Sequence, residues 1–480
     1  MSTGSTPKIP HSTSPDSDSI WDKQHRTLTL GSIIAVTIVA FRGLAMATVA
    51  PIVADDLNGN ALYGWIFSAF ILAQIMGTVI GGQEVDRRPP AHVFIVAIGI
   101  FAVGCLIAGS APSIYVLLLG RALQGFGAGA TFSCVYAIIS SVYEDHLRPA
   151  MLAAMSSAWI IPSLIGPALA GLVADHFGWR FVFFGLLPIL IGSVFLTMPI
   201  FLKLEPPTVD PGKSSSSNRV LQSVVLAVGT GLMLAGFDLG PWPIAAVTIV
   251  AGLALVVPML KALLPSGTFS ARPMVPAAIV ARATCFAAFL ITETYMVRAL
   301  KEFGGVSATI AGIVITAGSL TWTLGSFVQA RWDRTGGVET RPLRILTGSL
   351  LLLVSVGTVF LSVALFEHIG IEVALIVWMG AGLGIGIAYT TATTIAFAFA
   401  PKGEDGKVSS SLLLGENFLG SFGVGIGGAV YAIGQNQGAK VETSSAFALA
   451  LGVIFAGFAL ITGLRLMRDR LRPIASTLPV

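Results

Sequence analysis

Long apolar segments follow one another along the chain at near-regular intervals, separated by short polar stretches. Most reach the 20 or so residues that an α-helix needs to cross the hydrocarbon core of a bilayer. The pattern predicts an all-α polytopic membrane protein with fourteen spans. These spans are placed at residues 28–52, 62–83, 91–110, 113–141, 149–174, 181–203, 220–238, 241–262, 275–299, 306–331, 342–365, 371–397, 408–433 and 445–466.

Composition supports this class. Of the 480 residues, 54% are hydrophobic and 11% are charged, whereas a soluble protein carries about 25% charged residues. The net charge of +4 does not indicate a nucleic-acid partner, because most basic residues lie at the ends of the apolar segments. Residues 1–27 contain no apolar run and are predicted to be a disordered cytoplasmic tail, and residues 467–480 to be a second cytoplasmic tail.

The distribution of basic residues predicts the orientation. With the N-terminus inside, 21 of the 28 Lys and Arg residues fall on the cytoplasmic side. The predicted outer loops hold Arg180, Arg298, Lys301 and Lys440. Because cytoplasmic loops are enriched in Lys and Arg, both termini are expected to be cytoplasmic in a multi-pass protein of the plasma membrane.

The fourth segment carries an arginine inside an apolar run. Arg121 lies in LLLGRALQGFGAGATF, where an arginine costs roughly 2.5–3.5 kcal/mol on insertion scales and needs a partner or water. Gln124 follows at helical spacing, extends a polar stripe on the same face and is expected to line the substrate cavity. In the fifth segment, Pro162 and the Gly166-Pro167 pair are expected to bend the helix and open room beside Arg121.

These two segments resemble transporters of the major facilitator superfamily. Arg121-Ala-Leu-Gln-Gly125 resembles the fourth-helix motif of that superfamily. Gly166-Pro167 with Gly171 resembles the fifth-helix motif that marks its antiporters. The resemblance implies alternating access to a central site, and it implies transport rather than enzymatic catalysis.

The resemblance also implies the domain organisation. Residues 28–203 and 275–466 would form two six-helix halves, and residues 204–274 would join them through two extra spans. The total is that of the fourteen-span drug:proton antiporters. Two halves related by pseudo-symmetry are typical of this transporter architecture.

An internal repeat supports the two halves. The second segment ends in GTVIGGQEVDRR and the tenth in GSFVQARWDR, which places Asp86-Arg87 and Asp333-Arg334 in matching cytoplasmic loops. The resemblance implies a gating role for these residues, in which Asp86 meets the positive N-terminal end of a helix near Ser409 and latches the outward-facing state. A solvated turn is the alternative, and Arg88-Pro89-Pro90 departs from the family pattern here.

The first segment departs from the antiporter pattern in the sign of its charge. AFRGLAMATVAPIVADDL resembles the start of drug:proton antiporters, where an acidic residue commonly stands at the position of Arg42. Met46 follows four residues later and shares the face of Arg42. Both side chains are expected to line the substrate cavity.

The ninth segment offers a counter-charge. Glu293 shares its helix face with a basic, two aromatic and one sulfur-containing side chain, which suits a cavity for a lipophilic and possibly cationic ligand. We predict that Glu293 couples transport to protons, with Arg42 or Arg121 as its partner. The residues of this face are Arg282, Phe286, Phe289, Glu293 and Met296.

Glu416, in the segment 408–433, is a second buried carboxylate and the alternative proton carrier. For either glutamate a permanent salt bridge is the simpler alternative. No phosphate-binding loop, metal-ligand spacing or cofactor motif is found, so an ion gradient is the expected source of energy.

The predicted function is secondary active export of lipophilic or amphipathic small molecules in exchange for protons, by a monomer embedded in the lipid bilayer. An organic or lipid-linked anion is an alternative substrate, because Arg42, Arg121 and Arg282 would bring positive charge to the cavity. A membrane sensor or scaffold without transport is the third alternative.

Overall fold

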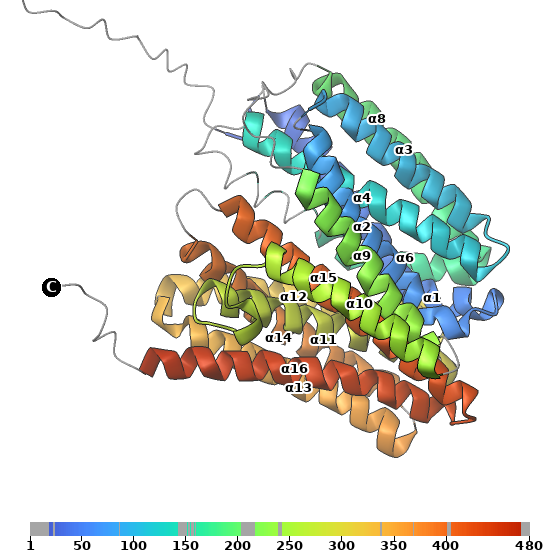
Figure 1. Ribbon diagram of the computed structural model, residues 1–480. Helices are drawn as coiled ribbons and strands as arrows, with labels where there is room; N and C mark the ends of the chain where they lie inside the picture. Colours follow the sequence, from blue (N-terminus) through green and yellow to red (C-terminus); the bar gives the residue numbers. More distant parts are fainter. Residues whose placement is uncertain are drawn as a thin grey trace, which may run out of the picture.

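The computed structural model describes a helical bundle, and every regular element in the described part of the chain is a helix (Figure 1). Three positions of the predicted gate lie partly or wholly outside the description: Asp86 and the side chains of Ser409 and Arg334. The side chain of Arg42 is likewise not described. The described residues are 19–471 without 23–24, 86, 143–150, 152–153, 155–157, 159, 203–216, 239–241, 337, 368 and 401–404.

The helices coincide with the apolar segments. Among the described residues, ten helices are long and apolar enough to cross a membrane, which makes the chain a multi-pass membrane protein. In chain order the elements are α1 (Arg26–Asp56), η1 (Asn60–Leu62), α2 (Tyr63–Val85), α3 (Pro90–Gly109), α4 (Ile114–Val142), α6 (Ile160–Phe177), α7 (Arg180–Phe184), α8 (Leu186–Phe201), α9 (Ser217–Asp238), α10 (Trp242–Leu263), η2 (Thr268–Ser270), α11 (Val275–Glu302), α12 (Ala308–Gly336), η3 (Val338–Thr340), α13 (Arg341–Phe366), α14 (Ile371–Ala398), α15 (Asp405–Asn436) and α16 (Val441–Leu471).

The helices gather into two bundles. In the N-terminal bundle, α4 packs on α2 and α3, and α1 packs on α6 and α8. In the C-terminal bundle, α14 packs on α12 and α13, and α16 packs on α11 and α13. The paired helices α9 and α10 lie beside both bundles, because α9 contacts α2 and α15 (Figure 1).

Glycines bring the backbones of α2 and α4 into contact. A Cβ atom on Gly125 would overlap the carbonyl group of Phe70, and one on Gly129 would overlap that of Gln74. Gly127 faces α3, where an added Cβ would lie 2.6 Å from the carbonyl oxygen of Ala97. The small residues of the fourth segment therefore allow two neighbouring helices to approach Arg121, as small residues do between membrane helices.

The predicted sixth segment is interrupted. Its apolar run forms the short helix α7 and the longer helix α8, with Gly185 in the turn between them. Glycine weakens a helix because its backbone loses more freedom on ordering than that of other residues. Val182, Phe183 and Leu186, next to this break, line a small cavity together with Arg121.

Charged and aromatic side chains join the two bundles at one end of the molecule. We call this the sealed end. It comprises the loops 57–62, 178–179 and 303–307 and the ends of the helices that these loops connect. Here Lys301 of α11 pairs with Asp55 of α1, and the Tyr63 hydroxyl donates a hydrogen bond to the carbonyl oxygen of Thr294 at 2.9 Å. The two bundles therefore meet firmly at the sealed end.

Arg298 corrects one expectation. It is predicted from the sequence to lie in an outer loop, but it lies in the last turns of α11 and is 1% exposed. Its Nη2 group donates hydrogen bonds to Asn60 at 3.1 Å and to the Tyr431 hydroxyl at 3.0 Å. The apolar segment simply extends further than predicted, and partners from both bundles enclose the charge.

Candidate functional site

Arg121 is held by neutral partners. Its Nε donates a hydrogen bond to the Ile66 carbonyl oxygen at 2.9 Å, and its Nη1 donates to the Gln124 amide oxygen at 2.9 Å. The guanidinium carbon lies 4.8 Å from the centre of the Phe70 ring. The Gln124 amide in turn donates to the Cys105 sulfur at 3.2 Å. No carboxylate of the described residues pairs with this buried guanidinium.

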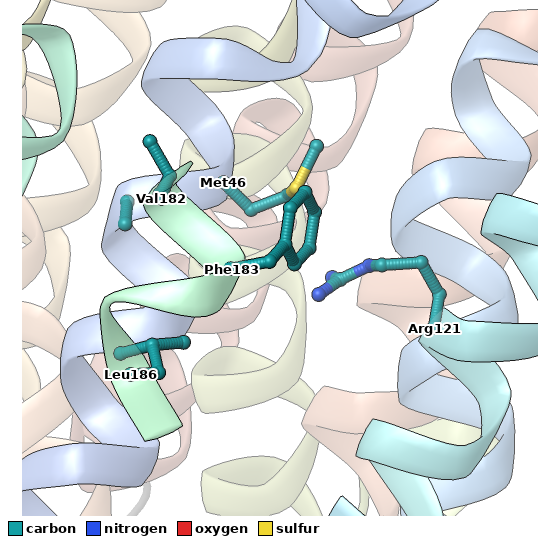
Figure 2. A pocket seen from close by; sticks show the side chains of 6 residues that line it. Met46, Arg121, Val182, Phe183 and Leu186 are labelled. Carbon is teal, nitrogen blue, oxygen red and sulfur yellow. The ribbon is translucent and has the colours of Figure 1, made fainter. Parts of the chain in front are cut away.

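A small cavity adjoins this guanidinium, and Figure 2 shows Arg121 pointing toward Phe183 and Met46. Its volume is about 10 Å³, close to the room that a single water molecule needs. The lining residues are Ala45, Met46, Arg121, Val182, Phe183 and Leu186. Met46 and Arg121, both expected at the substrate cavity, thus border the same space.

The antiporter-like face of α6 meets α12 of the other bundle. A Cβ atom on Gly171 would lie 2.6 Å from the carbonyl carbon of Ala308, and one on Gly312 would lie 2.6 Å from that of Pro167. Gly166, in contrast, faces the Phe41 ring of α1. Pro162, Gly166 and Pro167 are expected from the sequence to make room beside Arg121. In the structure, Pro167 and Gly171 lie where the two bundles approach closely.

A three-residue network lies within the C-terminal bundle. Arg282 donates a hydrogen bond through Nε to the Glu416 carboxylate oxygen Oε2 at 3.1 Å, and its Nη2 forms an ion pair with the same oxygen at 2.9 Å. The Tyr389 hydroxyl donates to this oxygen at 2.7 Å and accepts from Arg282 Nη2 at 2.5 Å. The three side chains come from α11, α14 and α15, so the network ties these helices together.

Arg282 and Glu416 are both candidates from the sequence, but their pairing and the part of Tyr389 are seen only in the structure. Helical spacing places Arg282 on the face of Glu293, eleven residues along the same helix. A tyrosine in the middle of an apolar segment is the signal that was available, because a buried Tyr hydroxyl usually has a hydrogen-bond partner.

Glu293 has a different environment. Its side chain is 5% exposed, and its Oε2 atom is buried without a hydrogen-bond partner among the described residues. Arg121, one of its two predicted partners, bonds to α2 and Gln124 instead. Arg42, the other, belongs to α1, but its side chain lies outside the description. The pairing of Glu293 with an arginine stays a prediction.

Aromatic rings surround the α11 face one turn from Glu293. The Phe289 ring lies 5.1 Å from Trp322 and 4.3 Å from Trp378, measured between centroids. Tyr389 adjoins Trp322 at 5.4 Å and Phe286 at 6.5 Å. The sequence analysis names the two phenylalanines and misses both tryptophans, because they lie on α12 and α14.

Met296, the last residue of this face, is fully buried in the apolar core near the sealed end. In this conformation it contributes to packing between the bundles rather than to an open surface. The same core contains residues of both bundles, among them Val49 and Val53 of α1.

The loop residues of the predicted gate are described in part. Asp333 accepts hydrogen bonds from Arg341 Nε and Nη2, each at 2.8 Å, and from Arg344 Nη1 at 2.6 Å. Both arginines belong to the first turn of α13, so they link the ends of α12 and α13. Arg87 lies in the turn after α2. The sequence analysis does not assign a role to either α13 arginine.

Two helical bundles that meet around buried charges define a multi-pass membrane transporter. The family model of the Major Facilitator Superfamily matches residues 31–424, so the chain belongs to this superfamily. Its members are transporters, and several relatives are named efflux pumps.

One relative is a "probable multidrug-efflux transporter" of Mycobacterium tuberculosis, 23% identical over 91% of this chain and 94% of its own length. An "MFS-type efflux pump" of Arthroderma benhamiae is 34% identical over 37% of this chain, and the match spans 33% of that pump. A "rubrofusarin-specific efflux pump" of Gibberella zeae is 29% identical over 38% of this chain and 34% of its own length.

Solved structures share the fold. A POT family transporter in complex with a thioalcohol-conjugated peptide superposes with a TM-score of 0.68, covering 93% of this chain and 96% of its own. The sequence identity is 13%, so this similarity concerns the fold alone.

Proposed function

We propose that the protein exports lipophilic or amphipathic small molecules in exchange for protons. Relatives named as multidrug or rubrofusarin efflux pumps support export of such compounds. The Gly-Pro face of α6, packed against α12, supports an antiporter that alternates between closed and open states of the sealed end.

The observation that carries proton coupling is the buried carboxyl group of Glu293, whose Oε2 atom has no hydrogen-bond partner among the described residues. An unpaired carboxylate is very unfavourable in an apolar interior, so such a group binds a proton instead. We therefore propose that Glu293 is protonated when the sealed end is closed. Opening of that end would admit water from the outside, which supplies the proton to Glu293, and opening of the cytoplasmic side would let this proton leave to the interior. Closure is thereby linked to proton uptake.

The proposed topology places the sealed end outside the cell. This orientation follows from the basic residues on the opposite side. The proposed topology has fourteen spans, arranged as two six-helix halves with the pair α9 and α10 between them, and both termini in the cytoplasm. The location would be the plasma membrane, and the proposed functional unit is a monomer. A reporter fused to either terminus and active only outside the cell would contradict this topology.

Reconstituted liposomes with an imposed pH gradient test the coupling. Addition of ethidium, a lipophilic cation, is expected to dissipate the gradient with the wild-type protein. Glu293→Gln mimics the protonated carboxyl and is expected to abolish gradient-driven ethidium transport while keeping ethidium counterflow.

Glu372→Gln, at the exposed first turn of α14, is the matched control and is expected to behave as wild type. If Glu293→Gln still concentrates ethidium against its gradient, Glu293 is not the coupling group, and Glu416 becomes the candidate to examine.

Transport of an organic anion is the second candidate function. It is favoured by the buried charge of Arg121, whose described partners are all neutral. Competition between ethidium and an aromatic carboxylate such as 1-naphthoate separates the two possibilities. Displacement of the bound substrate by naphthoate but not by ethidium would support transport of an organic anion.

A further inference from the structure

The last turn of α6 places a carboxylate against the first turn of a helix in the other bundle. Asp175 Oδ1 accepts a hydrogen bond from the backbone N–H of Ala308 at 3.3 Å. Asp175 Oδ2 accepts hydrogen bonds from the backbone N–H of Thr309 at 3.0 Å and from its hydroxyl at 2.6 Å. Because α12 begins at Ala308, these N–H groups have no carbonyl partner within their own helix.

Asp175 continues the tight seam between α6 and α12. Pro167, Gly171 and Asp175 are four residues apart and so share one face of α6. Pro167 meets Gly312 and Gly171 meets Ala308, which are also four residues apart on α12. The Asp175 carboxylate therefore lies at one end of the contact between α6 and α12. Its three hydrogen bonds form when these two helices are packed together.

We propose that Asp175 is a conformational latch, a positioning residue that favours closure of the sealed end by capping α12 across the two bundles. Its negative charge lies at the positive end of the α12 dipole, which strengthens the contact. When the bundles separate, the carboxylate and both N–H groups return to water and the capping bonds are lost. The latch thus acts on one facing state and leaves the substrate site untouched.

The expected magnitude follows from helix capping. Loss of a side-chain cap typically changes an equilibrium by about fivefold, equivalent to about 1 kcal/mol. Such a value suits a latch, because a much stronger contact would hold the protein in one state. The proposal rests on the alternation between facing states described above, and its test does not require substrate or protons.

The test measures how often the sealed end opens. Val53 of α1 is fully buried in the core that joins the bundles, so Val53→Cys reports opening by its labelling rate with a hydrophilic maleimide. Full-length protein in nanodiscs exposes both faces to the reagent. The native cysteines are buried, and protein without the introduced cysteine gives the background rate.

Asp175→Ala is expected to raise the labelling rate about fivefold, in line with a lost cap. Asp175→Asn keeps an acceptor oxygen without the charge and is expected to have a smaller effect. Thr309→Ala removes the hydroxyl bond, and the double variant Asp175→Ala/Thr309→Ala is expected to label no faster than Asp175→Ala alone.

The matched control is Asp56→Ala at the same end. Asp56 accepts hydrogen bonds from Trp179 at 3.0 Å and Arg180 at 2.9 Å, both in its own bundle, so its loss is expected to leave the labelling rate unchanged. A wild-type labelling rate in folded Asp175→Ala, or an equal increase in Asp56→Ala, would overturn the latch. If Asp175→Ala fails to fold, an unchanged rate in Thr309→Ala would overturn it as well.

Transport is measured separately on the same variants. Faster labelling without any proton movement in wild-type liposomes would retain the latch and reject the proposed antiport. Proton movement with an unchanged labelling rate in Asp175→Ala would retain the antiport and reject the latch.

Discussion

The guanidinium carbon of Arg298 lies 4.6 Å from the centre of the Tyr63 ring, although the two residues belong to different bundles. The Tyr431 ring flanks the same guanidinium at 4.1 Å. Glu302, one turn along α11, pairs with Arg298 Nη2 at 2.8 Å. An arginine enclosed between two aromatic faces thus joins the bundles at the sealed end.

Replacement of Tyr63 tests this contact. Tyr63→Leu removes a desolvated cation–π contact, worth about 2 kcal/mol, and a hydrogen bond worth about 1 kcal/mol. We expect a lower melting temperature and faster maleimide labelling at Val53→Cys. Tyr115→Leu, at a tyrosine that is 73% exposed, is the control. Equal melting temperatures for the two variants would contradict a structural role for the aromatic contact.

The Arg282–Glu416 pair predicts a non-additive pattern of stability. Arg282→Met leaves a buried carboxylate without its cation and is expected to destabilise the protein by about 3–5 kcal/mol. The double variant Arg282→Met/Glu416→Leu removes both charges and is expected to be considerably more stable than the single variant. Thermal unfolding of the purified protein measures both, and a double variant as unstable as the sum of the single ones would argue against the pair.

The seam between α6 and α12 predicts a steric effect. Gly312→Ala would place a methyl group 2.6 Å from the Pro167 carbonyl carbon, so closure of the sealed end requires the helices to separate. We expect this variant to lose ethidium transport and to label rapidly at Val53→Cys. Gly357→Ala, where an added Cβ meets no atom within 4 Å, is the control and is expected to stabilise α13 by roughly 0.5–1 kcal/mol. Normal transport by Gly312→Ala would show that the seam is not needed.

Asp56 predicts a pH dependence at low pH. Hydrogen bonds from the Trp179 indole and the Arg180 guanidinium lower the pKa of Asp56 below its usual value of 3.8. A carboxyl group with a depressed pKa stabilises the folded state above its unfolded pKa, and this contribution is lost as the pH falls through the folded pKa. We therefore expect Asp56→Asn to lower the melting temperature slightly at pH 7 and to match the wild type once the pH is below the depressed pKa of Asp56. If the melting temperatures of the variant and the wild type differ by the same amount at every pH, the charge of the Asp56 carboxylate is not the cause.

The apolar segments determined much of the fold in advance. Their length requires helices in a bilayer, since backbone groups in hydrocarbon must be satisfied within each segment. The glycines after Arg121 likewise indicated close helix contacts, because a missing side chain lets backbones approach wherever the neighbour lies. The antiporter family was likewise suggested by a motif within one segment, formed by Gly166, Pro167 and Gly171, which can be recognised without knowing how the helices pack.

Tertiary structure decided which charges meet. Helical spacing placed Arg282 on the face of Glu293, yet it could not show that Glu416 of α15 lies within hydrogen-bonding distance of Arg282. Nor could it show that Tyr389 joins them from α14.

The same limit applies at the sealed end, where Asp175 directly follows the predicted segment 149–174 and nothing in its own segment indicates a partner. Its role as a cap appeared when α12 was brought against α6. Periodicity gives the direction of a side chain relative to its own helix, whereas its partner depends on the packing of helices that are distant in sequence.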